Sequence, residues 1–350
     1  MTLTDKYGQI GKPEEQQQVV VRSNPVELTR AAFSVWLPIA LNTQMGKVYN
    51  EAIYHEAVQM LKPIGNAFAN ISNGELEAIL KDVEKSKQEY DLTREAGLFV
   101  SAILNATALP MLSGKFSYEN IGYRLGPEKI LILQPGSKMM WAGELALGKI
   151  VNYGNVEFFA ARAAGGVQIN CNTAQFHAYY ATGGIQLNYK SGYGMGAHAD
   201  GGIQVNFGDI EILGQELNGG IQANLGSLNL LGIDTGNGFQ INLGTGNLGH
   251  AKVYRSNAEM QIHMGKLKQY AWTRGRKVGR ARFEAMRQPI RELADLFREV
   301  AALGPSFLPE ELEHHDPESV KRALSYDWQQ FESSTIKLVD QIKAVAVARK

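Results

Sequence analysis

Gly201-Gly202-Ile203-Gln204-Val205-Asn206 belongs to a series of short segments that return every 18 residues in the middle of the chain. The other members are Gly165-Gly166-Val167-Gln168-Ile169-Asn170, Gly183-Gly184-Ile185-Gln186-Leu187-Asn188, Gly219-Gly220-Ile221-Gln222-Ala223-Asn224 and Asn237-Gly238-Phe239-Gln240-Ile241-Asn242. A short, fixed period is typical of a solenoid, in which each repeat is one turn of a coil.

Weaker copies extend the series in both directions. Leu131-Ile132-Leu133-Gln134 and Lys149-Ile150-Val151-Asn152 keep the phase upstream, and Met260-Gln261-Ile262-His263 follows after a three-residue insertion. The sequence therefore predicts about eight turns over residues 131–265, stacked into a rod roughly 35 to 40 Å long at the spacing of neighbouring strands.

Each turn is expected to hold two strands and two corners. The paired glycines precede the first strand, where a sharp corner needs positive φ. A second strand is predicted at Val156–Phe159, Gln175–Tyr179, Ile210–Leu213 and Leu228–Leu231, because these segments occupy the same phase in successive turns. His177 and His198 fall on this strand and are interpreted as single surface histidines, although a base between coils is left open.

Alternation within the first strand predicts two unlike faces. Apolar residues such as Ile203 and Val205 are assigned to the core, and the amide side chains to the opposite, outward face. Stacked amides can bond to their equivalents in neighbouring turns. The amides serve this structural purpose alone or also form a docking face, made of Gln168, Gln186, Gln204, Gln222, Gln240, Asn170, Asn188, Asn206, Asn224 and Asn242.

The regions on either side of the repeats are predicted to be helical. After a polar, disordered leader at 1–24, helices are expected over 25–125, with Asn24 as a cap and Pro25 at the first helical position. The C-terminal region, 266–350, is expected to hold a long helix over 267–303 and another from Asp316 to the end. The predicted fold class is thus mixed α and β in separate regions.

Two flanking segments suggest a contact with lipid. Residues 96–112 contain no charge and lie at the lower length limit for spanning a bilayer, but a buried helix that caps the first turn is favoured. Residues 265–291 are basic, and Arg274, Arg276, Lys277, Arg280 and Arg282 are candidate contacts for an anionic partner. A solvated face, or pairing with the acidic stretch 310–318, ranks above such binding.

Composition and motifs restrict the function further. Lys and Arg number 35, as do Asp and Glu, so no overall charge favours nucleic acid. Common phosphate-binding, zinc and nucleophile motifs are absent, and we expect no catalytic residues, cofactor or metal. In turn length the repeat resembles left-handed β-helix acyltransferases, but the hexapeptide phase of those enzymes is missing. A polar N-terminus predicts a cytoplasmic location and leaves leaderless secretion open.

The favoured hypothesis is a non-enzymatic scaffold or assembly protein that docks to itself or to a protein partner through the amide face. The first alternative is a membrane-active or host-directed effector that uses the 96–112 helix and the basic 265–291 segment. An acyltransferase-like solenoid enzyme ranks third.

Overall fold

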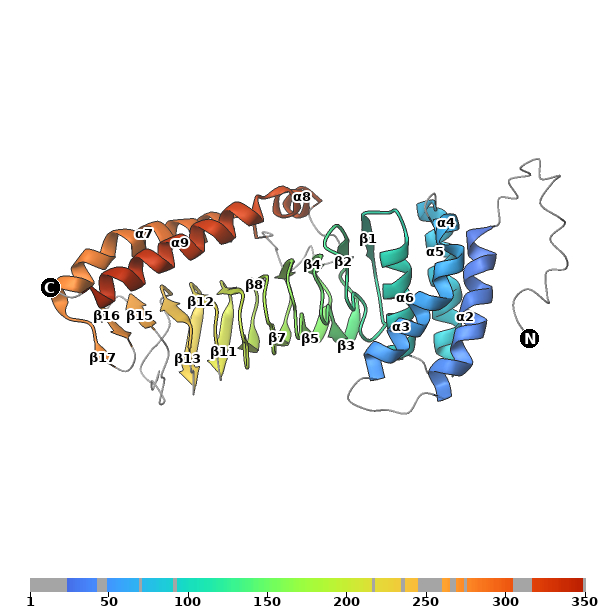
Figure 1. Ribbon diagram of the computed structural model, residues 1–350, viewed down its shortest axis with the longest axis horizontal. Helices are drawn as coiled ribbons and strands as arrows, with labels where there is room; N and C mark the ends of the chain where they lie inside the picture. The colour runs from blue at the N-terminus through green and yellow to red at the C-terminus, as the bar shows by residue number, and fades with distance from the viewer. Residues whose placement is uncertain are drawn as a thin grey trace.

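The computed structural model describes residues 24–42, 49–68, 71–90, 93–215, 218–233, 237–244, 260–264, 269–273, 276–304 and 317–348. A bundle of helices is followed along the long axis by a β-solenoid, and the C-terminal helices return along one side of the solenoid (Figure 1). The predicted fold class is confirmed. Except for Asn24, the predicted leader lies outside the described residues.

The solenoid consists of two sheets. Sheet A has 11 strands in the order β1 (Met111–Gly114), β2 (Ile130–Leu133), β4 (Lys149–Asn152), β6 (Val167–Asn170), β8 (Ile185–Asn188), β10 (Ile203–Asn206), β12 (Ile221–Asn224), β14 (Phe239–Asn242), β15 (Met260–Met264), β16 (Gln269–Thr273) and β17 (Arg276–Lys277). Sheet B has six strands, β3 (Lys138–Ala142), β5 (Asn155–Phe159), β7 (Ala174–His177), β9 (Gly192–Met195), β11 (Asp209–Gln215) and β13 (Ser227–Ile233). All of these strands are parallel except β16 and β17. They form about seven turns, where about eight were predicted.

The register of sheet A follows the repeat closely. Ile203 pairs with Ile185 on one side and with Ile221 on the other. The predicted insertion before Met260 is confirmed by the pairing of Phe239 with Met260. Upstream, the predicted phase is wrong by one residue, because Leu133 and not Gln134 pairs with Asn152. The loop after β2 is two residues longer than the loop after β4, and the corner after β3 is one residue shorter than the corner after β5, which together give this shift.

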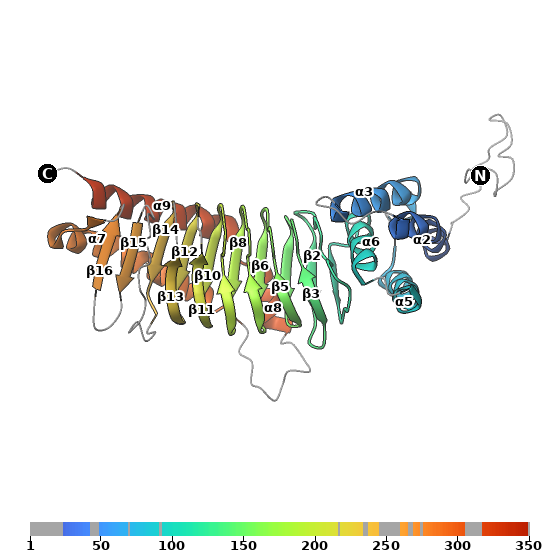
Figure 2. The same ribbon diagram turned by 90° about the horizontal axis from the view of Figure 1, so that it is seen from below.

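The two faces of sheet A are the reverse of the prediction. The Gln and Asn columns point into the coil, where Gln222 Nε2 donates to the carbonyl of Gly196 at the end of sheet B. The apolar columns, which include Ile203 and Val205, face outward and pack under helices α7 (Arg280–Ala301) and α9 (Trp328–Val347). Both faces are buried because the C-terminal helices cover the outer one, as Figure 2 shows from below.

Sharp corners connect the strands. The glycine directly before each of β6, β8, β10, β12 and β14 has positive φ, from +65° at Gly166 to +118° at Gly238. At Gly184 a Cβ would lie 2.5 Å from the carbonyl carbon of Gly165 in the preceding turn, so a side chain does not fit. The predicted role of the paired glycines is confirmed.

Helices α2 (Pro25–Asn42), α3 (Tyr49–Leu61), η1 (Lys62–Ile64), α4 (Gly65–Phe68), α5 (Asn73–Tyr90) and α6 (Thr93–Ala106) form the N-terminal bundle. The Asn24 cap is confirmed, since its Oδ1 accepts from the Val26 N–H at 3.0 Å. Helix α6 lies against the first turn, where Ser101 Oγ accepts from the Gly122 N–H at 2.9 Å. A shared apolar core joins this bundle to the start of the solenoid.

The C-terminal region differs from its prediction in two places. The helix predicted over 267–303 starts only at Arg280, because β16 and β17 form an antiparallel hairpin on the edge of β15. The last helix is split into α8 (Pro317–Ser325) and α9, since Asp327 caps α9 by accepting from the Gln330 N–H at 2.9 Å. The hairpin therefore covers a strand edge that a helix would leave unpaired.

Candidate functional site

The ten residues predicted to form a docking face lie inside the solenoid and are almost inaccessible to solvent. Their neighbours in register complete two columns, which we call the Asn ladder and the Gln ladder. The Asn ladder consists of Asn152, Asn170, Asn188, Asn206, Asn224 and Asn242, and the Gln ladder of Gln168, Gln186, Gln204, Gln222, Gln240 and Gln261. Amide stacking is confirmed, whereas the outward orientation was wrong.

The Asn ladder is continuous. Each Nδ2 donates to the Oδ1 of the asparagine in the next turn toward the C-terminus, at 2.7 to 2.9 Å. Most of these amides also donate to the carbonyl two residues further along, as Asn206 does to Gly208 at 2.7 Å. The ladder ends at His263, whose Nδ1 lies 3.3 Å from Asn242 Nδ2. These asparagines therefore stabilise the corner that follows their own strand and link neighbouring turns by hydrogen bonds.

The Gln ladder runs in the opposite direction. Gln186, Gln204, Gln240 and Gln261 donate through Nε2 to the preceding glutamine, at 2.7 to 3.0 Å. The chain of bonds is interrupted between Gln204 and Gln222, where the buried Oε1 of Gln204 has no hydrogen-bond partner among the described residues. Both ladders stabilise the stack and fix its register, so neither is an accessible binding surface.

His177 is also buried inside the coil, which corrects the prediction of a surface residue. Among the described residues neither ring nitrogen has a hydrogen-bond partner. Burial lowers the pKa of His177 from 6.5 to about 3, so the ring is neutral near pH 7. His198 is half-exposed and stacks on Tyr180. The two histidines therefore do not form a shared base.

The basic residues lie at the far end of the rod. Arg276, Lys277, Arg280 and Arg282 are exposed, the first two on β17 and the others at the start of α7. Arg274 lies outside the described residues, and so does most of the 310–318 stretch proposed to pair with this segment. No described contact of these arginines and lysines points to a particular anion, so their binding role stays a prediction.

The apolar segment 96–112 is divided between two elements. Residues 96–104 are buried on α6, and the predicted helix ends at Ala106 before β1 begins at Met111. Within the described part of the chain, no helix is both long and apolar enough to cross a bilayer. Insertion of α6 into lipid would therefore first require it to leave the protein core.

A row of half-exposed and exposed aromatic side chains lies on the outer face of sheet B and was not predicted. Trp141 stacks on Phe158 at 4.3 Å between ring centroids, and Phe158 stacks on Phe176 at 5.1 Å. Tyr193 continues the row, and Tyr179 and Tyr180 lie beside it. We call these six residues the aromatic stripe. The stripe is hidden in the sequence because its residues do not share one position of the repeat; Gly194, and not Tyr193, is the register partner of Phe176.

The aromatic stripe is the counterpart of the apolar columns of sheet A, but no helix of the described residues covers it (Figures 1 and 2). Tyr180 and Tyr193 are each 43% exposed, and the neighbouring Met140 is 46% exposed. Trp141, Phe158 and Phe176 stack face to face and are half-exposed, and Tyr193 meets Phe176 edge-on. This arrangement is suited to packing against another protein surface.

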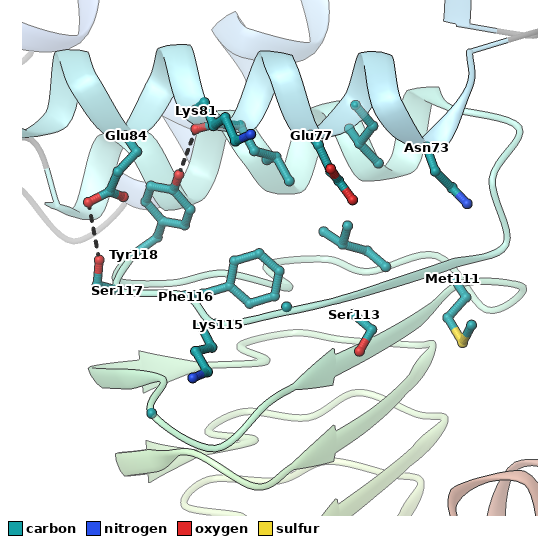
Figure 3. A pocket seen from close by; sticks show the side chains of 15 residues that line it. Asn73, Glu77, Lys81, Glu84, Met111, Ser113, Lys115, Phe116, Ser117 and Tyr118 are labelled. Atoms are coloured by element: carbon teal, nitrogen blue, oxygen red, sulfur yellow. Dashed lines mark hydrogen bonds between the residues drawn. The ribbon is translucent and has the colours of Figure 1, made fainter. Parts of the chain in front are cut away.

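A groove of about 620 Å³ separates α5 from β1 (Figure 3). Leu76, Leu80, Leu112 and Phe116 contribute apolar side chains to it, while Glu77, Lys81 and Lys115 contribute charges of both signs. At one end Tyr118 donates to the Leu80 carbonyl at 3.0 Å and Ser117 donates to Glu84 at 3.4 Å. We call this site the edge groove, because β1 is the terminal strand of sheet A.

Comparison with known proteins identifies no relative: no family model, curated protein or solved structure matches the chain. Among the described residues no group of three or more His, Cys, Asp or Glu side chains could hold a metal ion. The features of the molecule that bear on its function are therefore the aromatic stripe, the edge groove and the cross-linked stack of the solenoid.

Proposed function

We propose that the protein is a non-enzymatic scaffold that assembles through the aromatic stripe of sheet B. The observation that carries this proposal is the contrast between the two outer faces of the solenoid. Helices of the same chain cover the apolar face of sheet A, whereas no described helix covers the aromatic stripe, in which Tyr180 and Tyr193 are exposed and the other four residues are half-exposed. A clustered apolar surface of this kind is typical of an interaction site.

A second copy of the chain is the partner proposed for the stripe. Equal numbers of acidic and basic residues leave no net charge to oppose association. Contact of one stripe with the same stripe on another copy is isologous, so it closes at a dimer and does not continue into a filament. Two rods would then lie face to face, with both N-terminal bundles and both edge grooves accessible. A cytoplasmic location remains part of this proposal.

Rigidity supports the scaffold role. The Asn and Gln ladders connect neighbouring turns through side chains as well as through the backbone, and α7 and α9 run along the length of sheet A (Figure 1). Such a rod holds surfaces at fixed distances from each other. The free energy of unfolding is distributed over the whole stack, because each turn is stabilised by contacts with its neighbours.

The test is the mass of the protein in solution. By light scattering after size exclusion, the wild-type chain of 38.5 kDa is expected to elute as a dimer at micromolar concentration. Tyr180→Asp combined with Tyr193→Asp should return it to a monomer with an unchanged melting temperature, because both side chains are exposed.

The matched control is Ile336→Asp combined with Val347→Asp, which adds the same charges at exposed apolar positions of α9. This control should remain dimeric. A wild-type monomer at high concentration, an open-ended filament, or a dimer that survives the tyrosine changes would contradict the proposed assembly.

A further inference from the structure

The edge groove lies beside unpaired backbone groups of β1. In a parallel ladder, alternate residues direct their N–H and C=O to opposite edges of the strand. The Pro110 and Gly114 carbonyls accept from the N–H groups of Ile130 and Gln134, so this set of residues faces β2. Met111 and Ser113, which alternate with them, therefore face the other edge, where no strand of the described residues pairs with β1.

The neighbouring strand shows what this edge can bind. On β2, Ile130 and Gln134 face β1, whereas the Lys129 and Leu133 carbonyls accept from Lys149 and Tyr153 on the other side. Every interior strand of sheet A is paired in this way on both edges. The free edge of β1 therefore has the same backbone donors and acceptors that hold the other turns together.

Helix α5 forms the opposite wall of the groove and sets its dimensions (Figure 3). The contacts of Tyr118 and Ser117 with α5 close one end, while Asn73 and Met111 border the other end. An extended chain presents the backbone donors and acceptors that this strand edge can pair with. Burial keeps the pKa of the Tyr118 hydroxyl well above its usual range, so this closing hydrogen bond persists at neutral pH.

We propose that the edge groove binds an extended peptide segment of a partner protein as an additional strand on β1. Backbone hydrogen bonds to Met111 and Ser113 would hold the peptide, and alternate side chains would contact Leu76, Leu80 and Phe116. Charges of both signs at the rim favour a segment without a strong net charge. The four residues of β1 set the length of the paired segment.

The first experiment uses capped hexapeptides in which Val, Leu, Ile or Phe alternates with Ser, Thr, Lys or Glu. A pool is mixed with the full-length protein, retained peptides are identified by mass spectrometry, and the best one is measured by fluorescence anisotropy. It is then N-methylated at alternate amides, in two complementary sets. Methylation of the set that faces β1 should weaken binding roughly tenfold, because about two hydrogen bonds are lost, and the other set should change it little.

The second experiment changes the protein. Ser113→Pro removes an N–H that faces the groove and is not needed for pairing with β2, so the ladder should survive. Binding should fall at least roughly tenfold, whereas the matched control Ser113→Ala should bind normally. If Ser113→Pro lowers the melting temperature strongly, this variant is set aside, and the comparison of the two N-methylated peptide sets alone tests whether the peptide pairs with β1.

Three results would overturn the proposal. The first is that no peptide of the pool is retained, and the second is that both methylated sets bind equally. The third is that a well-folded Ser113→Pro protein binds as the wild type does. A larger species that Ser113→Pro dissociates, but that the Tyr180 and Tyr193 changes leave intact, would identify a second copy as the occupant. Peptide binding by the edge groove does not require dimerisation through the aromatic stripe. A monomeric wild-type protein would therefore contradict the proposed function and not the peptide site.

Discussion

The first turns and the later turns fill the same interior columns with opposite chemistry. Leu131 and Ile150 precede Gln168 in one column, and Leu133 precedes Asn152 in the other. All five side chains are fully buried. This difference shows that an interior side chain must be chemically compatible with the side chains at the same position in the two neighbouring turns. Aliphatic side chains meet this requirement by packing, and amides meet it by hydrogen bonding to each other.

The largest effect is expected from a charge within the Asn ladder. Asn206→Asp removes the donor to Gly208 and to Asn224 and places a carboxylate inside the coil. The free energy of unfolding should fall by at least roughly 5 kcal/mol, which combines lost hydrogen bonds and an unpaired buried charge. Urea unfolding measures this loss. Asn155→Asp at an exposed position is the control and should change stability little.

A smaller effect should distinguish packing from hydrogen bonding in the first turns. Leu131→Asn and Leu133→Asn each lose buried aliphatic contacts, worth roughly 3 to 5 kcal/mol. At position 133 the new amide lies beside Asn152 and can extend the Asn ladder, whereas at position 131 it lies beside Ile150. The Leu133 change should therefore cost about 1 kcal/mol less. If both variants lose the same free energy of unfolding in urea, a hydrogen bond to Asn152 does not stabilise the new amide at position 133.

The smallest effect is the pH dependence caused by His177. Its pKa is lowered by burial from 6.5 to about 3, so the unfolded chain binds a proton more readily than the folded one. The stability contribution is fully present above pH 6.5 and is lost as the pH falls toward 3, at about 1.4 kcal/mol per pH unit. Denaturant unfolding between pH 7.5 and 4.5 measures the slope.

His177→Met is the informative variant, because Met195 occupies the next position of the same column. It should be as stable as the wild type or more stable, with a shallower slope. Some slope should remain, since burial also lowers the pKa of His263. An unchanged slope would assign the pH dependence to other groups.

Much of the solenoid could be predicted from local sequence, whereas the two surfaces proposed for binding, the aromatic stripe and the edge groove, could not. Paired glycines and the 18-residue period located the strands of sheet A from β6 to β14. The aromatic stripe combines Trp141, Phe158 and Tyr193, which do not share one position of the repeat, because Gly194 and not Tyr193 continues the column of Trp141, Phe158 and Phe176. The edge groove combines α5 with β1, and their contact depends on how the N-terminal bundle packs on the first turn.

The sequence by itself determined the repeat, its register from β4 to β15 and the alternation of apolar and amide side chains. Only the tertiary structure decided which of these two faces lies inside, because alternation has the same period seen from either side. The apolar face could be outermost because α7 and α9 cover it, through residues such as Phe283, Ile290 and Phe331. The amides could be innermost because each one has a hydrogen-bond partner in a neighbouring turn, which replaces part of the water that it loses.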